Sequence, residues 1–77
     1  MNKHRRKKLS DVFDKLTEIM DTLEEVKNEE EESYENLPDG LKCSQKGEEM
    51  DKYIAMLEEA YGYLDDANTV IEEMKEG

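Results

Sequence analysis

Apolar residues recur at heptad spacing through both halves of the chain, and this repeat restricts the fold more than any other feature of the sequence. In the first half they occupy positions a (Leu9, Leu16, Leu23), d (Val12, Ile19, Val26) and e (Phe13, Met20). In the second half they occupy a (Met50, Leu57, Leu64, Ile71), d (Tyr53, Ala60, Ala67, Met74), e (Ile54, Tyr61) and g (Met56, Tyr63, Val70). A repeat sustained over three heptads predicts two long amphipathic helices.

The stretch Asn36–Gly40 separates the two predicted helices. A residue that precedes proline is disfavoured in the α conformation, so the first helix is expected to end near Leu37. Pro38-Asp39-Gly40 suits a tight turn in which the glycine takes a positive φ. Ser44 is the predicted N-cap of the second helix, and Ser10 is a plausible N-cap for the first, which should begin between positions 3 and 11.

These boundaries predict one all-α domain, residues 1–77, folded as an antiparallel two-helix hairpin. The first helix is expected over about residues 3–36, the loop over residues 37–43, and the second helix over about residues 44–76. With the turn near Pro38–Gly40, facing residue numbers should sum to about 80.

This register places Ile19 near Tyr61. It also sets the basic run at residues 3–8 beside Glu72, Glu73 and Glu76. Exposed pairs of this kind are worth only about 0–1 kcal/mol each, but they would give the run a structural role.

Two helices alone enclose no core. The second helix also carries more apolar surface than one neighbouring helix can cover, so it should lie between two neighbours. Domains of this size commonly need a partner or a cross-link for stability. We therefore expect a homo-oligomer, in the simplest case a dimer that forms a four-helix bundle.

Charge is distributed unevenly along the chain, whose formal net charge is −11. Residues 3–8 hold five of the eleven basic residues, whereas from Asp11 onward 22 acids face six lysines. So negative a surface disfavours direct binding to nucleic acid or to an anionic membrane, and suits a basic protein surface. The predicted partner-binding residues are Glu29, Glu30, Glu31, Glu32, Asp65 and Asp66. The alternative is that these acids only keep an exposed helix face soluble.

No constellation of residues indicates catalysis, a metal site or a cofactor. The one histidine, His4, has no acid three residues before it, as a Glu-x-x-His metal motif requires. Cys43 has no activating base nearby in the sequence, and a single cysteine forms no internal disulfide. The sequence therefore predicts a protein that is not an enzyme. The chain also has no apolar run that resembles a membrane span or a signal peptide, so we expect it in the cytoplasm.

A second binding hypothesis concerns a small nucleotide. Tyrosines at a dimer groove can stack on a base, and basic residues near the start of a helix can bind its phosphates. The residues assigned to this site are Arg5, Arg6, Lys7, Lys8, Tyr61 and Tyr63. The protein would then sequester a nucleotide signal.

Several residues around the loop carry a resemblance to known sequences. They are Tyr34-Glu35-Asn36-Leu37-Pro38, Leu41, Ser44, Gly47-Glu48, Met50 and Met56-Leu57-Glu58-Glu59-Ala60. Over roughly residues 34–76 the chain resembles short uncharacterised proteins of phages and prophages of Gram-positive bacteria.

The resemblance implies a phage setting, in which small binding proteins often block host defence or host enzymes. It leads to the expectation of a non-enzymatic inhibitor of a host factor, acting in the host cytoplasm by protein–protein interaction. A structural or assembly role is the remaining alternative.

Overall fold

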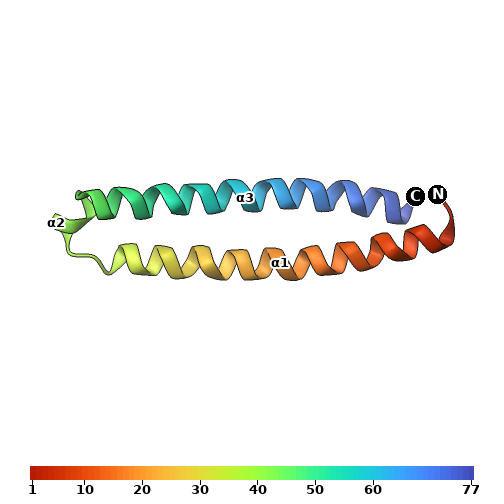
Figure 1. Ribbon diagram of the computed structural model, residues 1–77, viewed down its shortest axis with the longest axis horizontal. Helices are drawn as coiled ribbons and strands as arrows, with labels where there is room; N and C mark the ends of the chain where they lie inside the picture. Colours follow the sequence, from red (N-terminus) through yellow and green to blue (C-terminus); the bar gives the residue numbers. More distant parts are fainter.

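A computed structural model describes the whole chain, residues 1–77, and it is helical without a strand (Figure 1). Two long helices, α1 (Lys3–Glu35) and α3 (Gln45–Glu76), run antiparallel. A single-turn helix, α2 (Asp39–Lys42), lies in the connection between them, at the end of the rod opposite the two termini. The Cα atoms form a rod of 58 × 14 × 12 Å. The predicted all-α hairpin is therefore confirmed, and α1 and α3 each lie within one residue of the predicted helix ends.

The N-caps of the two long helices agree with the prediction at one helix and differ at the other. Ser44 caps α3: its Oγ accepts the Gly47 N–H at 3.5 Å, and its hydroxyl donates to the Leu41 carbonyl. The proposed N-cap Ser10 is wrong, because α1 already begins at Lys3. There the Asn2 side chain accepts the Arg5 N–H at 2.8 Å. The basic run is thus the first part of α1.

The connection between the long helices is helical where a tight turn was expected. No glycine in the chain has a positive φ, and Asp39–Lys42 form the turn of α2. Pro38 precedes this turn, and its carbonyl accepts the N–H groups of Leu41 and Lys42 at 2.8 and 3.1 Å. Proline fits this position because its fixed φ suits the start of a helix and its missing N–H is not needed there.

Helix α2 packs closely on the first turn of α3. Gly47 is buried at this contact, and a Cβ built on it would lie 2.6 Å from the Leu41 carbonyl oxygen and closer still to that of Lys42. Any side chain at this position would therefore force the two backbones apart.

The side chains that α1 and α3 pack against each other form a seam in which the spacing alternates between three and four residues. Its best-covered members on α1 are Leu9, Phe13, Leu16, Met20, Leu23 and Lys27. On α3 they are Ile54, Leu57, Tyr61, Leu64, Asn68 and Ile71. Met20, at 6% exposure, is the one apolar side chain that the hairpin buries.

The seam differs from the predicted one by a rotation of about half a residue position in each helix. Val12, Ile19 and Val26 were expected at d in the core and are instead exposed, Ile19 by 55%. Phe13 and Met20 directly follow two of them in the sequence. Because Leu9, Leu16 and Leu23 stay in the seam, a rotation of about 50° exchanges one set for the other. The larger side chains bury more apolar area, and this favours the observed rotation.

The register of the two helices also differs from the prediction. Thr17 faces Asn68 and Lys27 faces Glu58, so facing residue numbers sum to 85 and not to about 80. The expected neighbour pair of Ile19 and Tyr61 is therefore wrong. The difference arises at the loop end, where α1 ends at Glu35, level with Met50, and the first turn of α3 packs on α2 instead.

The two sides of the seam differ in character. One row of the seam consists of Phe13, Met20 and Lys27 on α1 and of Ile54, Tyr61 and Asn68 on α3. Because the helices are antiparallel, the residues that directly precede the members of this row lie on the same side of the hairpin in both helices. This side, the apolar face, carries Val12, Ile19, Val26, Tyr53, Ala60, Ala67 and Met74, and extends on α3 to Met56, Tyr63 and Val70. The opposite side, the polar face, carries Ser10, Thr17, Glu24, Glu31, Asp51, Glu58, Asp65 and Glu72. The hairpin is thus two-sided.

Candidate functional surfaces

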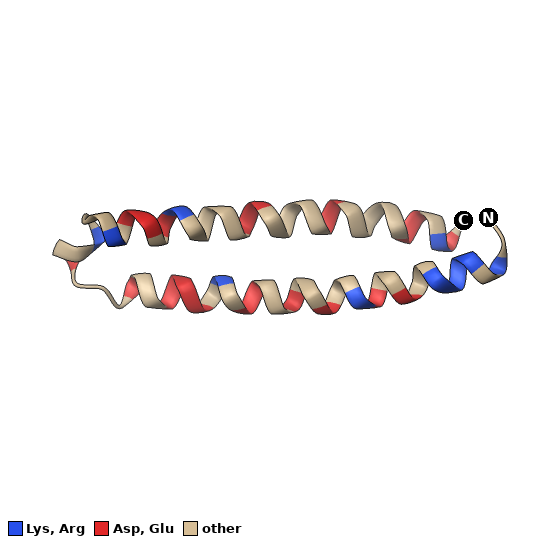
Figure 2. Ribbon diagram, viewed as in Figure 1, with Lys and Arg blue, Asp and Glu red and all other residues tan.

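The loop end of the polar face forms a shallow hollow with an acidic rim. Its lining residues are Asn28, Glu31, Glu32, Tyr34, Glu35, Asp51 and Ile54. Tyr34 and Ile54 are half-buried and supply the apolar part of the surface. The carboxylates of Glu32, Glu35 and Asp51 form no ion pair within the chain. The hollow therefore presents free negative charge around a small apolar patch, and Figure 2 shows acidic residues along this half of the rod.

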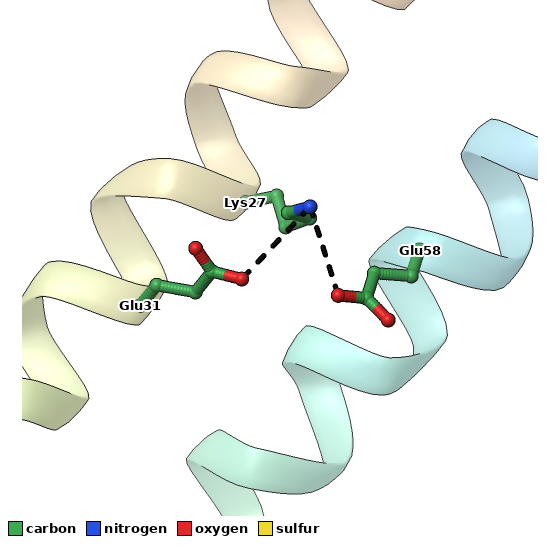
Figure 3. A network of polar contacts seen from close by, with 3 residues as sticks. All are labelled: Lys27, Glu31 and Glu58. Atoms are coloured by element: carbon green, nitrogen blue, oxygen red, sulfur yellow. Dashed lines mark ion pairs between the residues drawn. The ribbon is translucent and has the colours of Figure 1, made fainter.

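Lys27 neutralises part of the same face. It lies in the seam, and its Nζ is 3.9 Å from the Glu31 carboxylate and 3.6 Å from that of Glu58 (Figure 3). These three residues connect α1 to α3 in the half of the rod nearer the loop. Both carboxylates are more than a third exposed, so each pair contributes only about 0–1 kcal/mol. A second shallow hollow, over Leu23, Leu57 and Tyr61, adjoins this network.

The predicted partner-binding acids do not form one patch. Glu29 and Glu32 are exposed, whereas Glu30 and Glu31 are half-buried, because they lie at the edge of the seam. Asp65 and Asp66 are exposed, as expected, on α3. Glu31 is level with Ile54, so Asp65 lies about 16 Å further along the rod. The structure therefore offers a loop-end patch and a separate patch on the C-terminal half of α3.

The residues assigned to nucleotide binding lie apart within one hairpin. Lys8 is level with the end of α3, and Arg5, Arg6 and Lys7 precede it at the free end of the rod (Figure 2). Tyr61 lies in the seam, and Tyr63 is 66% exposed on the apolar face. Lys8 and Tyr63 are separated by about 14 residues of helix, or about 20 Å. One chain does not bring a base-stacking ring and this phosphate-binding run to a common site.

The basic run also lacks the ion pairs expected for it. The three ion pairs of the chain involve Lys27 and Lys42, and none joins residues 3–8 to Glu72, Glu73 or Glu76. The shift in register explains this result, because it moves the run towards and past the end of α3. At the same end, Lys75 instead covers the Phe13 ring, with Nζ 4.4 Å from the ring centre.

Asn68 is a buried polar residue that sequence reasoning missed. It is only 7% exposed, and its Nδ2 donates to Thr17 Oγ1 at 3.2 Å, while the Thr17 hydroxyl donates to the Phe13 carbonyl at 2.9 Å. Its Oδ1 has no hydrogen-bond partner. A lone asparagine among apolar seam residues is a signal for register selection, since the observed register pairs its amide N–H group with Thr17.

The remaining residues with potential chemistry are isolated. Cys43 is exposed next to α2, and no group of three or more His, Cys, Asp or Glu side chains is placed to hold a metal ion. No helix is long and apolar enough for a membrane span.

Comparison with known proteins yields no relative that would assign the chain to a family. No protein-family model, no curated protein and no solved structure matches it significantly.

Proposed function

We propose that the protein is a non-enzymatic inhibitor that binds a basic surface of a host protein through the acidic hollow at its loop end. In the phage setting that the resemblance implies, the host protein is a defence factor. The observation that supports this proposal is the combination of unpaired carboxylates with the apolar patch of Tyr34 and Ile54. Charged rims steer and select a partner, while buried aromatic groups supply much of the binding energy.

We further propose that the protein acts as a homodimer. The hairpin by itself buries only one apolar side chain, Met20, and leaves an apolar face along its length uncovered. Exposed apolar surface on this scale is a cost for a monomer and is removed when two copies pack together. In such a dimer the polar faces stay outside, so the acidic hollow of each copy remains accessible.

Binding by the loop end is tested with charge-reversal variants in a pull-down from host lysate. Glu32→Lys combined with Glu35→Lys should abolish retention of the host protein that the wild type captures. Glu72→Lys combined with Glu73→Lys is the matched control, with the same change in charge on α3 near the free end of the rod, and should retain it. Binding should also weaken as salt rises, because the contact is largely electrostatic. Equal capture by both variants would contradict the proposal.

The second predicted acidic patch is tested in the same assay. Asp65→Lys combined with Asp66→Lys should capture the host protein as well as the wild type, if the loop-end hollow alone forms the binding surface. Loss of capture in this variant only would move the binding surface to the C-terminal half of α3.

A further inference from the structure

The apolar residues of α3 outside the seam form a second heptad repeat beside it. This α3 stripe consists of Tyr53, Met56, Ala60, Tyr63, Ala67, Val70 and Met74, again spaced by alternating three and four residues. It covers 21 residue steps, or about 31 Å of helix. Its large members are 39–66% exposed, and Tyr63 is the most exposed large apolar residue of the chain. A repeat of this length is typical of a helix that packs along a second helix.

The order of side-chain sizes in the α3 stripe is nearly the same in both directions. Tyr63 is central, an alanine stands on either side of it, and larger residues stand beyond the alanines. When two copies of α3 are placed antiparallel about Tyr63, Ala60 comes level with the second copy's Ala67. Tyr53 likewise comes level with the second copy's Met74. Small residues around a central ring allow close approach of the two helices, and a sequence that matches its own reverse suits a two-fold interface.

We infer that the second copy packs antiparallel on the α3 stripe, with the two-fold axis at Tyr63. This inference rests on the proposed dimer and specifies its geometry. It places α3 against α3, and therefore α1 against α1, in a four-helix bundle in which the two hairpins point in opposite directions.

The apolar face of α1 fits the same axis. Thr22 is level with Tyr63 in the hairpin, so the axis passes α1 at Thr22. Ile19 of one copy then comes level with Val26 of the other. Lys15 comes level with Glu29 of the other copy, which pairs opposite charges at the border of the interface. Two helices thus agree on one position for the axis, although their sequences are independent.

The distribution of charge favours the opposite orientation of the two hairpins over a parallel one. The basic run at residues 3–8 lies at the free end, and the loop half of the rod is acidic (Figure 2). In the antiparallel dimer, Lys8 comes level with Glu49 and Asn36 of the second copy, so the basic run of each copy lies at the loop end of the other. A parallel dimer would set basic run on basic run and acidic end on acidic end, which costs free energy.

The area of the apolar face is sufficient for a stable pair. The α3 stripe is about 31 Å long, and two packed helices are about 20 Å wide. Each copy would therefore cover about 600 Å², or about 1,200 Å² for the pair, which reaches the lower end of the range for specific stable interfaces. The interface is also apolar at its centre, as homodimer interfaces are.

The test combines light scattering with thiol cross-linking in a Cys43→Ser background, which removes the native thiol. Single cysteines are introduced at three positions of the α3 stripe, in Tyr63→Cys, Tyr53→Cys and Met74→Cys, and each protein is treated with a short bifunctional thiol reagent. Circular dichroism establishes that each variant remains helical. In the antiparallel dimer the two copies of residue 53 are about 30 Å apart, beyond the reach of the reagent.

The expected result is a dimer in which Tyr63→Cys cross-links to itself, whereas Tyr53→Cys and Met74→Cys cross-link only when the two are mixed. The mixed pair lies away from the axis, so it tests the geometry even when Tyr63→Cys weakens association. Self-cross-linking of Tyr53→Cys and of Met74→Cys would show a parallel pair and overturn the inference. A dimer without any of these cross-links would place the interface elsewhere and overturn it too. A monomer by light scattering would instead refute the proposed dimer itself.

Discussion

Replacement of Gly47 by alanine tests the contact between α2 and α3 directly. A Cβ at residue 47 would lie 2.6 Å from the Leu41 carbonyl oxygen and even closer to that of Lys42, both of them backbone atoms. Backbone cannot rotate away as a flexible side chain can, so α2 must move. That movement pulls the Leu41 carbonyl away from the Ser44 hydroxyl and disturbs the N-cap of α3.

The size of the effect follows from these contacts. Overpacking at a tight contact typically costs about 1–3 kcal/mol, and the loss of a serine N-cap costs about 0.5–2 kcal/mol. Alanine recovers up to about 1 kcal/mol over glycine within a helix. The free energy of unfolding of Gly47→Ala should therefore fall by about 1–3 kcal/mol, which lowers the Tm by about 10 °C for a domain of this size.

The assay is urea and thermal unfolding followed by circular dichroism, at one protein concentration for all variants, because association adds to the apparent stability. Gly40→Ala is the matched control, since a Cβ there meets no atom within 4 Å and the residue has no positive φ. It should unfold at the wild-type urea concentration or slightly above it. If Gly47→Ala is as stable as Gly40→Ala, α2 does not pack on the first turn of α3. The explanation given above for the register, in which facing residue numbers sum to 85, would then fail as well.

Three further substitutions give distinct outcomes in urea unfolding. Gly62→Ala should raise the free energy of unfolding by about 0.5–1 kcal/mol, because a Cβ there meets open space within a helix; a decrease would indicate a close neighbour at this position. Asn68→Leu should raise the free energy of unfolding by about 1 kcal/mol, because the substitution removes a buried oxygen without a partner, whereas Asn68→Asp should lower the free energy of unfolding. A lower stability of Asn68→Leu would mean that the hydrogen bond to Thr17 outweighs the unpaired oxygen. Lys27→Met should change the free energy of unfolding by less than about 1 kcal/mol, since both partner carboxylates are exposed, and a loss above about 2 kcal/mol would assign the ion pairs a major role.

The hairpin was predictable because its signals are periodic and repeated. Heptads on both sides of a single proline leave few alternatives to two long antiparallel helices. The rotation of α1 was harder to predict, because Val12 and Phe13 are adjacent and both apolar, so the pattern accommodates either at the seam. Which of the two residues enters the seam depends on the side chains of α3 that pack against it. The sequence of α1 alone does not contain that information.

The loop and the candidate surfaces were less predictable for a related reason. Proline and glycine indicated a break in the chain, but they suit the first turn of a short helix as well as a tight turn. That difference shifted the register of α1 against α3 by five residues, from a sum of about 80 to a sum of 85. The register in turn decides which charged residues of the two helices face each other. The basic run lost its expected acidic neighbours in this way, although its charge and position were evident from the sequence. Asn68 was visible as one polar residue in an apolar row, and its position in the seam was the available signal.

The two-sided hairpin separates the two kinds of binding that we propose. Apolar side chains beyond the seam lie on one side, where a second copy of the same chain offers the complementary surface. The acids of the polar face lie on the other side with the hollow beside Tyr34, and a second copy on the apolar face would leave that hollow open. A dimer built on Tyr63 therefore has two identical acidic hollows about its two-fold axis, near opposite ends of the bundle. Such an arrangement allows two host molecules, or two sites of one symmetric host protein, to be bound at once, and the second case gains affinity from the linkage of the two sites.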